Sequence, residues 1–212
     1  MSSEASSTIL KKVYSARTNA QLEEAYDEWA ADYNAHVTGF GYKSPAVAVG
    51  LMGRYVQDIE APVLDAGAGS GLVGELLMAM GYRNLAGIDL SQGMLAKADQ
   101  TGAYRELRQM VLGESLDFPD NQFSASQSVG VFTAGHAPAA AFDELARVVA
   151  PGGHIIFSLL DSIYEENGFR AKFDNLSAEG KWKLVEKTPA FAALPYEDPA
   201  IQHRVFAFQV LE

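Results

Sequence analysis

The chain has 212 residues, of which 48% are hydrophobic and 20% charged, a composition typical of one globular domain with a buried core. Its formal net charge of -11 disfavours nucleic acid and anionic membranes as partners, because phosphate groups would be repelled. Cysteine is absent, which excludes disulfides, thiolate metal ligands and a cysteine nucleophile, and we expect no metal site. With no long apolar run and no leader-like segment, we expect a cytoplasmic protein with a single domain over residues 1–212.

The first part of the chain is expected to be helical. Residues 1–8 are small and polar and predict a disordered start. Behind Asn19, a suitable N-cap, apolar residues recur at three- and four-residue spacing, which predicts a helix. Those residues are Leu22, Ala25, Tyr26, Trp29 and Tyr33. A second helix is expected from Pro45, which suits a first helical turn, to Val56.

From residue 61 onward, short apolar runs alternate with amphipathic segments. The runs predicted as strands are 61–67, 84–90, 106–114, 123–132 and 154–160, and the segments predicted as helices are 71–81, 91–102 and 139–153. This alternation requires right-handed crossovers and a mainly parallel sheet covered on both faces. Two further runs, 181–188 and 203–211, lack a full helix between them and predict an antiparallel pair. The predicted fold is α/β and doubly wound, with a seven-stranded, mostly parallel sheet and an antiparallel C-terminal edge strand.

A glycine-rich turn follows the first predicted strand in "VLDAGAGSGLVGELL". Gly67, Gly69 and Gly71 alternate there, and glycine lets the backbone N–H groups and a helix N-terminus approach a ligand closely. From Gly69 the string "GSGLVG" matches a dinucleotide pattern, with Asp89 at the end of the next strand. A glycine-rich turn that binds no ligand is the simpler alternative.

Asp65 is expected to decide which ligand this turn holds. A carboxylate at the mouth of the loop would repel a pyrophosphate, but it would attract a ligand that carries positive charge. S-adenosylmethionine has an ammonium group, a sulfonium and a ribose, and Asp89 is placed to accept hydrogen bonds from both ribose hydroxyls. The alternative for Asp89 is a helix cap, a role that Ser91 already fills.

Three motifs resemble the class I S-adenosylmethionine-dependent methyltransferases. They are "VLDAGAGSG", "GIDLSQGML" and "ELARVVAPGGHIIFSL", in the family's order between Val63 and Leu160. The segments "YDEWAADYNAHV", "GYKSP" and "VGVFTAGHAP" are most similar to the methyltransferase-like proteins of the Williams–Beuren region type. The resemblance implies a Rossmann-like fold, with residues 19–56 as N-terminal lid helices.

The resemblance also implies a set of cofactor contacts. Asp65, Ala66, Gly67, Ala68, Gly69 and Gly71 would hold the methionine part of S-adenosylmethionine. Asp89 would bind the ribose, while Leu90 and Met94 would pack on the adenine or belong to the core. Gly113 and Glu114 would face the adenine amino group, although an alignment on "LDFPD" places Leu112 there instead.

The resemblance implies two further cofactor contacts, of which Val129 would border the transferable methyl group. Val129 lies at the end of the fourth predicted strand, and Tyr33 lies where a lid helix would touch the cofactor. The aromatic stripe that contains Tyr33 is equally explained by packing.

The implied activity is methyl transfer from S-adenosylmethionine to a small-molecule acceptor, with S-adenosylhomocysteine as product. His136 is the candidate general base, needed only for an acceptor that holds its proton at neutral pH; a loop histidine without function is the alternative. An NAD(P)-dependent oxidoreductase is a rival, disfavoured by Asp65 and by the absence of a Tyr-x-x-x-Lys pair. A non-catalytic S-adenosylmethionine-binding protein is the other.

Overall fold

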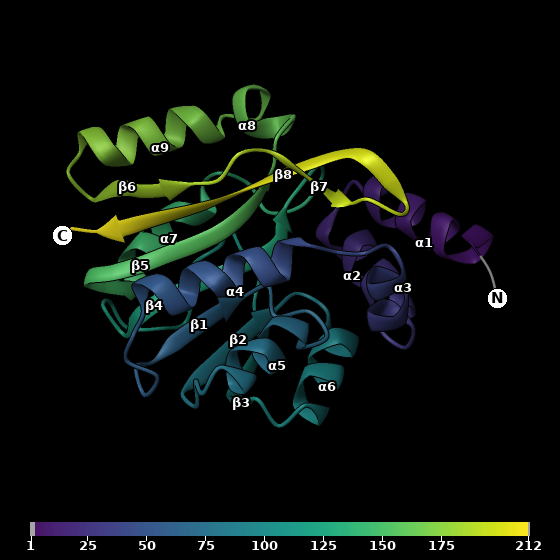
Figure 1. The fold of residues 1–212 in the computed structure, drawn as a ribbon, viewed down its shortest axis with the longest axis horizontal. Helices are drawn as coiled ribbons and strands as arrows, with labels where there is room; N and C mark the ends of the chain where they lie inside the picture. Colours follow the sequence, from purple (N-terminus) through teal and green to yellow (C-terminus); the bar gives the residue numbers. More distant parts are fainter. Residues whose placement is uncertain (1–2, 212) are drawn as a thin grey trace.

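The fold is a central β-sheet with helices on both faces, and the computed structural model describes residues 3–211 (Figure 1). Its helices are α1 (Ser3–Ser15), α2 (Asn19–Trp29), α3 (Tyr33–Gly39), α4 (Ser44–Tyr55), α5 (Leu72–Ala79), α6 (Gln92–Gln100), α7 (Ala141–Val148), α8 (Ile163–Glu166) and α9 (Phe169–Ala178). Its strands are β1 (Val63–Ala66), β2 (Leu85–Asp89), β3 (Tyr104–Gln109), β4 (Phe123–Phe132), β5 (Val149–Leu160), β6 (Trp182–Lys187), β7 (Phe191–Leu194) and β8 (Asp198–Val210). Within this range no helix combines the length and the apolar character that crossing a membrane requires.

The sheet has eight strands in the order β3-β2-β1-β4-β5-β8-β6, with β7 paired to β8. The strands from β1 to β5 pair in parallel, whereas β8 runs antiparallel to β5, β6 and β7. The doubly wound, mostly parallel α/β fold is therefore confirmed.

Two details of the predicted sheet are wrong. The number of strands is eight instead of seven, because β7 forms inside the connection that the sequence left without structure. The C-terminal strand β8 is antiparallel as expected but lies inside the sheet, and β6 lies at the edge. Val205 to Phe208 are consecutive buried residues, so β8 is covered on both faces, as an interior strand must be.

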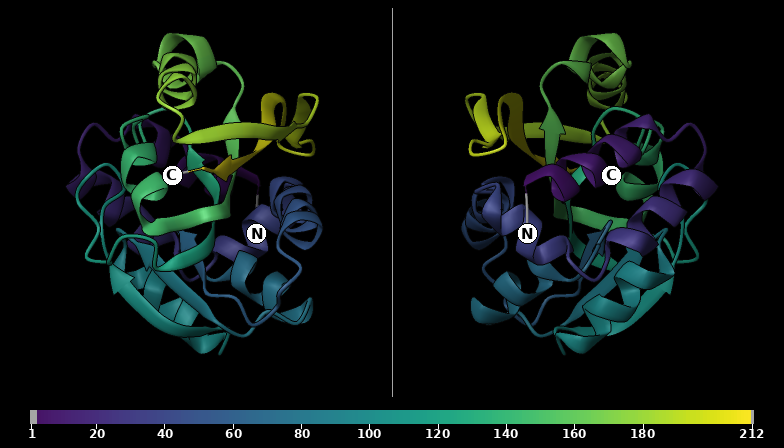
Figure 2. Two further views of the ribbon diagram at one scale, coloured as in Figure 1. Left: turned by 90° about the vertical axis from the view of Figure 1, so that its left-hand side faces the viewer. Right: turned by 90° about the vertical axis from the view of Figure 1, so that its right-hand side faces the viewer.

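Helices cover both faces of the sheet, as the views in Figure 2 show, and a separate hydrophobic core lies on each face. On one face, residues of α4 and α5 pack with Val63 of β1, and on the other face residues of α7 and α9 pack with Leu64. Because successive side chains of a strand point to opposite faces, Asp65 shares the face of Val63. This direction of Asp65 matters for the site below.

The N-terminal helices form a third apolar cluster that differs from the prediction. The segment predicted as one helix is divided into α2 and α3, and Thr18 replaces Asn19 as the cap, its side chain accepting the Gln21 N–H over 3.2 Å. Residues 3–8, for which we predicted disorder, belong to α1, while residues 1 and 2 lie outside the described range. Further along α1, Val13 is buried against α2, and this packing explains why α1 is ordered as a helix.

Candidate functional site

A cavity of about 320 Å³ lies at the carboxyl ends of the parallel strands, where ligands bind in doubly wound folds. Its walls come from the loops after β1, β2, β3 and β4, and α2 and α3 cover it. The predicted site residues that line it are Tyr33, Gly67, Gly69, Asp89, Leu90, Met94, Gly113, Glu114, Val129 and His136. The structure therefore brings together residues that are far apart in the sequence.

Several cavity residues were missed by sequence reasoning. They are Asn19, Leu22, Tyr26, Ile88, Met110, Val111, Gly130, Val131, Ala137 and Pro138. Leu112 lines the wall together with Gly113 and Glu114, so both alignments of that segment pointed to the cavity. The signal that could have found Leu22 and Tyr26 is their position on the same helix face as the aromatic stripe.

Asp89 is the carboxylate of this cavity that ties two loops together. Its Oδ2 accepts the Gly69 N–H over 2.9 Å, and its Oδ1 accepts the Ser91 N–H over 2.9 Å. Burial raises the pKa of Asp89, and these backbone N–H groups oppose that shift. Ser91 caps α6 by accepting the Met94 N–H over 3.0 Å, as predicted, so Asp89 is not needed as the cap.

Helix α2 contacts the second of these loops, the one after β2, through another carboxylate. Asp27 Oδ1 accepts the Ser91 hydroxyl over 2.5 Å and the Gly93 N–H over 2.8 Å. The covering helix is thus joined by hydrogen bonds to the start of α6, next to Asp89. Any movement of α2 away from the cavity would break these bonds.

The Asp65 side chain is turned toward the α5 side of the sheet. It is fully buried, and its Oδ2 accepts the Tyr104 hydroxyl over 2.6 Å. The pKa of Asp65 is raised to about 7, mainly by burial; the charge of Asp89 adds to this rise and the hydrogen bond from Tyr104 opposes it. Its expected contact with the cofactor's methionine part stays a prediction, although Asp65 is not among the residues that line the cavity. The reason is the strand alternation, which turns Asp65 toward α5.

Ala66, Ala68 and Gly71 are also outside the cavity lining. Gly71 adopts a φ of 87° as the N-cap of α5, and a Cβ there would lie 2.9 Å from Ala98 Cα in α6. Gly71 therefore serves the close packing of two helices. Gly67 is different, because a Cβ there would lie 2.2 Å from Val131 Cγ2 at the cavity wall.

His136 is held in one defined protonation form. Its Nδ1 lies 3.0 Å from the Ala134 carbonyl oxygen, which can only accept, so Nδ1 carries the ring proton. Thr133 Oγ1 lies 2.9 Å from the same nitrogen. Nε2 is then an acceptor, and the Tyr26 hydroxyl donates to it over 2.9 Å. Burial lowers the pKa of His136, so the ring is neutral at pH 7.

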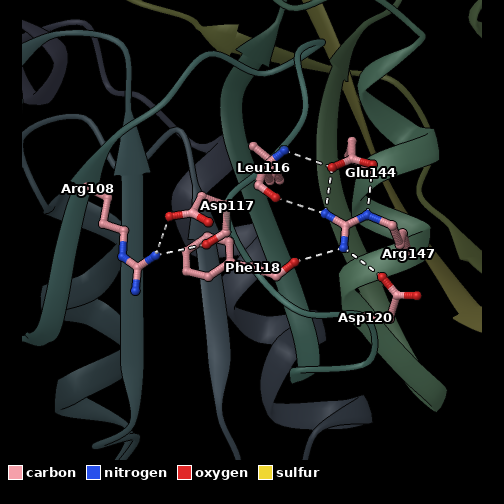
Figure 3. Close-up of polar contacts among 7 residues, drawn as sticks. All are labelled: Arg108, Leu116, Asp117, Phe118, Asp120, Glu144 and Arg147. Carbon is pink, nitrogen blue, oxygen red and sulfur yellow. Dashed lines mark hydrogen bonds and ion pairs between the residues drawn. The ribbon is translucent and has the colours of Figure 1, made fainter.

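The loop after β3 forms one wall of the cavity and is anchored from α7 (Figure 3). Arg147 donates to the backbone carbonyls of Leu116 over 2.9 Å and of Phe118 over 2.8 Å. Glu144 pairs with Arg147 and accepts the Leu116 N–H over 2.8 Å. Arg108 holds the same loop from β3, by donating to the carbonyl of residue 117 over 2.8 Å. These bonds fix the loop on both sides.

Comparison with known proteins assigns the family. Residues 64–157 match a family model described as a methyltransferase domain. The chain is 34% identical over 179 residues to Methyltransferase-like protein 27 of Homo sapiens, a match that covers 80% of this chain and 71% of that protein. The chain belongs to the class I S-adenosylmethionine-dependent methyltransferases. The cofactor of this methyltransferase is S-adenosylmethionine, the product is S-adenosylhomocysteine, and the oxidoreductase alternative is set aside.

Other relatives match more narrowly or at the level of the fold. The methyltransferase is 34% identical over 103 residues to the ubiquinone biosynthesis O-methyltransferase of Alkalilimnicola ehrlichii, covering 47% of this chain and 41% of that one. A putative methyltransferase in complex with the Haloferax volcanii Trm112 activator has a TM-score of 0.65 and 18% identity, covering 88% and 98% of the two chains. The [4+2]-cyclase SpnF has a TM-score of 0.70 and 18% identity, covering 92% and 97%. A cyclase among these neighbours illustrates that such a likeness establishes the fold alone.

Proposed function

We propose that this methyltransferase methylates a small-molecule acceptor, which it binds beside the cofactor beneath α1, α2 and α3. The observation that carries the proposal is the cavity itself, which α2 and α3 cover and which holds the Asp89 carboxylate on its wall. A covered site suits a small acceptor better than a polymer, and the net charge of -11 works against an acceptor made of nucleic acid.

The cavity residues fit S-adenosylmethionine chemically. Asp89 offers carboxylate oxygens to the ribose hydroxyls, and the backbone at Gly67 and Gly69 leaves room for the methionine part. Leu90 and Met94 provide apolar surface for the adenine. Gly113, Glu114, Val129 and Tyr33 complete the proposed contacts. The bound cofactor supplies a methyl group on a positively charged sulfur, so the protein's main tasks are positioning and the exclusion of water.

His136 is the proposed general base for an acceptor that holds its proton. Its neutral ring lies on the cavity wall, and its Nε2 has a lone pair directed to the Tyr26 hydroxyl. Tyr26 lines the same cavity, so the pair can pass a proton from an acceptor hydroxyl to Nε2. Thr133 and the Ala134 carbonyl keep the ring in the form that accepts that proton.

The cofactor site is tested by calorimetric titration with S-adenosylhomocysteine. Asp89→Asn should weaken binding by about 1–3 kcal/mol, because a charge-assisted hydrogen bond is replaced by a neutral one. Asp99→Asn is the matched control, since Asp99 is exposed on α6, away from the cavity, and its loss removes the same charge. An unchanged affinity for the Asp89 variant would refute the proposed ribose contact.

The acceptor class is tested with isotopically labelled S-adenosylmethionine and a cell extract. We expect the labelled methyl group in the small-molecule fraction. Label that is found only in the protein or nucleic-acid fraction would contradict a small-molecule acceptor.

A further inference from the structure

A second, smaller recess of about 50 Å³ adjoins the cofactor cavity beneath α1. Tyr26, Tyr33, Gly130 and His136 line both spaces, so the recess begins where the reacting methyl group is proposed to lie. Its far wall comes from β8, through His203. The recess therefore lies on the acceptor side of the proposed cofactor site.

The recess is apolar and uncharged. Leucine, valine and tryptophan side chains from α1, α2 and α3, together with Phe40 directly after α3, form much of its wall. Among the described residues that line it, none is an aspartate, glutamate, lysine or arginine. Burial lowers the pKa of His203 to about 4 and also lowers the pKa of His136, so both rings are neutral at pH 7. An ionised ligand group would lose its hydration here without gaining an opposite charge.

His203 has one ring nitrogen that the protein leaves unpaired. The side chain is 3% exposed, and its Nδ1 lies 2.9 Å from the hydroxyl of Ser44, which is itself fully buried at the start of α4. The other nitrogen, Nε2, is buried and has no hydrogen-bond partner within residues 3–211. Buried polar atoms of folded proteins are nearly always paired, so an unpaired atom on a cavity wall points to a ligand.

We propose that this recess binds the polar end of the methyl acceptor, an uncharged compound with a hydroxyl group next to apolar carbon atoms, and that His203 Nε2 hydrogen-bonds this hydroxyl. The inference rests on the proposed function, because it needs a small acceptor beside the cofactor. A hydroxyl both donates and accepts, so it pairs with either form of the His203 ring. Ser44 is the positioning residue that holds Nδ1.

The size of the recess limits what it takes in. A cavity of about 150 Å³ holds benzene. The recess of about 50 Å³ accommodates the hydroxyl and the carbon atoms beside it. The remainder of the acceptor lies against Tyr26, Tyr33 and His136, on the wall shared with the cofactor cavity. This places the atom to be methylated near His136 and the recognised hydroxyl near His203.

The test uses phenol as the probe. Toluene, which has no hydroxyl group, and benzoate, which carries a negative charge, are the comparison compounds. Trp29 lines the recess, so its fluorescence reports binding in the presence of saturating S-adenosylhomocysteine. The wild-type protein should bind phenol about tenfold more tightly than toluene, the ratio expected from one buried hydrogen bond, and should bind benzoate more weakly still. His203→Phe keeps an aromatic ring of similar size and should remove the preference for phenol without changing the affinity for toluene.

Ser44→Ala is the second variant, in case the phenylalanine does not fit. It should reduce the phenol preference several-fold, because the ring loses its fixed position. Equal binding of phenol and toluene by the wild type, benzoate binding as tight as phenol, or an unchanged preference in both variants would overturn the inference. Titration with S-adenosylhomocysteine distinguishes a failure of the proposed function from a failure of the acceptor recess. If the wild type does not bind S-adenosylhomocysteine, the proposed function fails. If all three proteins bind it equally but show no phenol preference, only the acceptor recess is refuted.

Discussion

Replacing Asp65 by asparagine should stabilise the protein relative to the wild type, and this gain should increase as the pH rises. The carboxyl group is fully buried, and burial raises its pKa from 3.8 to about 7. Between these two values the folded protein holds a proton that the unfolded chain releases, so the free energy of unfolding falls as the pH increases. Below pH 3.8 Asp65 is protonated in both the folded and the unfolded protein, so it has no effect on stability. Above about pH 7 it is ionised in both, and the free energy of unfolding decreases no further. Asparagine has the same shape and never ionises.

The magnitude follows from the difference between the two pKa values. At about 1.4 kcal/mol for each pKa unit, ionisable Asp65 lowers the free energy of unfolding by about 1.5 kcal/mol at pH 5 and about 4 kcal/mol at pH 8. Burial raises the pKa of Tyr104 well above 10, so its hydroxyl keeps its proton at both pH values. The hydrogen bond from Tyr104 therefore contributes equally to the stability of the variant at pH 5 and pH 8. The stability difference between variant and wild type should therefore grow by about 2.5 kcal/mol from pH 5 to pH 8.

Urea unfolding of both proteins at pH 5 and pH 8 measures this difference. Comparison at equal pH cancels the titration of the remaining groups, and the exposed Asp99→Asn variant controls for the loss of a negative charge. A stability difference that stays constant between the two pH values would refute the assignment of the raised pKa to Asp65.

Two other predictions concern the residues around the cavity. His136→Gln should slow methyl transfer by about 10²–10⁴-fold while leaving S-adenosylhomocysteine binding unchanged. Because burial lowers the pKa of His136, the wild-type rate should decline in acid only below pH 6.5. A rate that is insensitive to the substitution would remove the general base. Arg147→Lys should lower the free energy of unfolding by about 1–3 kcal/mol and weaken cofactor binding, because one ammonium nitrogen cannot take the place of the two guanidinium nitrogens that bond Glu144 and the two carbonyls. Arg170→Lys, at an exposed ion pair with Glu165, should change neither quantity, and equal effects of the two substitutions would contradict the anchoring role.

Local sequence signals predicted the elements on which the site is built. Ser91 caps α6 as expected, and Gly81 follows the end of α5 with a φ of 104°. The alternation of strands and helices was readable because each parallel strand is a short apolar run bounded by turn residues. Loops that follow parallel strands meet at one edge of the sheet, so most of the predicted cofactor residues were brought to a single cavity.

Features that depend on tertiary packing were not readable from the sequence. Residues 3–8 are small and polar, and the order of α1 depends on contacts further along the helix, such as Val13 against α2. β7 pairs only with β8, whose position inside the sheet is set by contacts between segments far apart in the chain. The pairing of His203 with Ser44 joins residues that are 159 positions apart, and periodicity carries no information about such a pair.

The buried position of Asp65 changes the electrostatic argument for the choice of cofactor. We had expected two carboxylates at the mouth of the cavity to exclude a pyrophosphate. Asp65 instead lies under α5, outside the cavity lining, and a carboxyl group with a pKa of about 7 carries its charge in only about half of the molecules at pH 7. Asp89 and Glu114 are the acidic residues that line the cavity within the described range, and no lysine or arginine faces them there. A diphosphate would meet negative charge without a basic partner, so the preference for a positively charged cofactor is retained through Asp89 and the wall after β3.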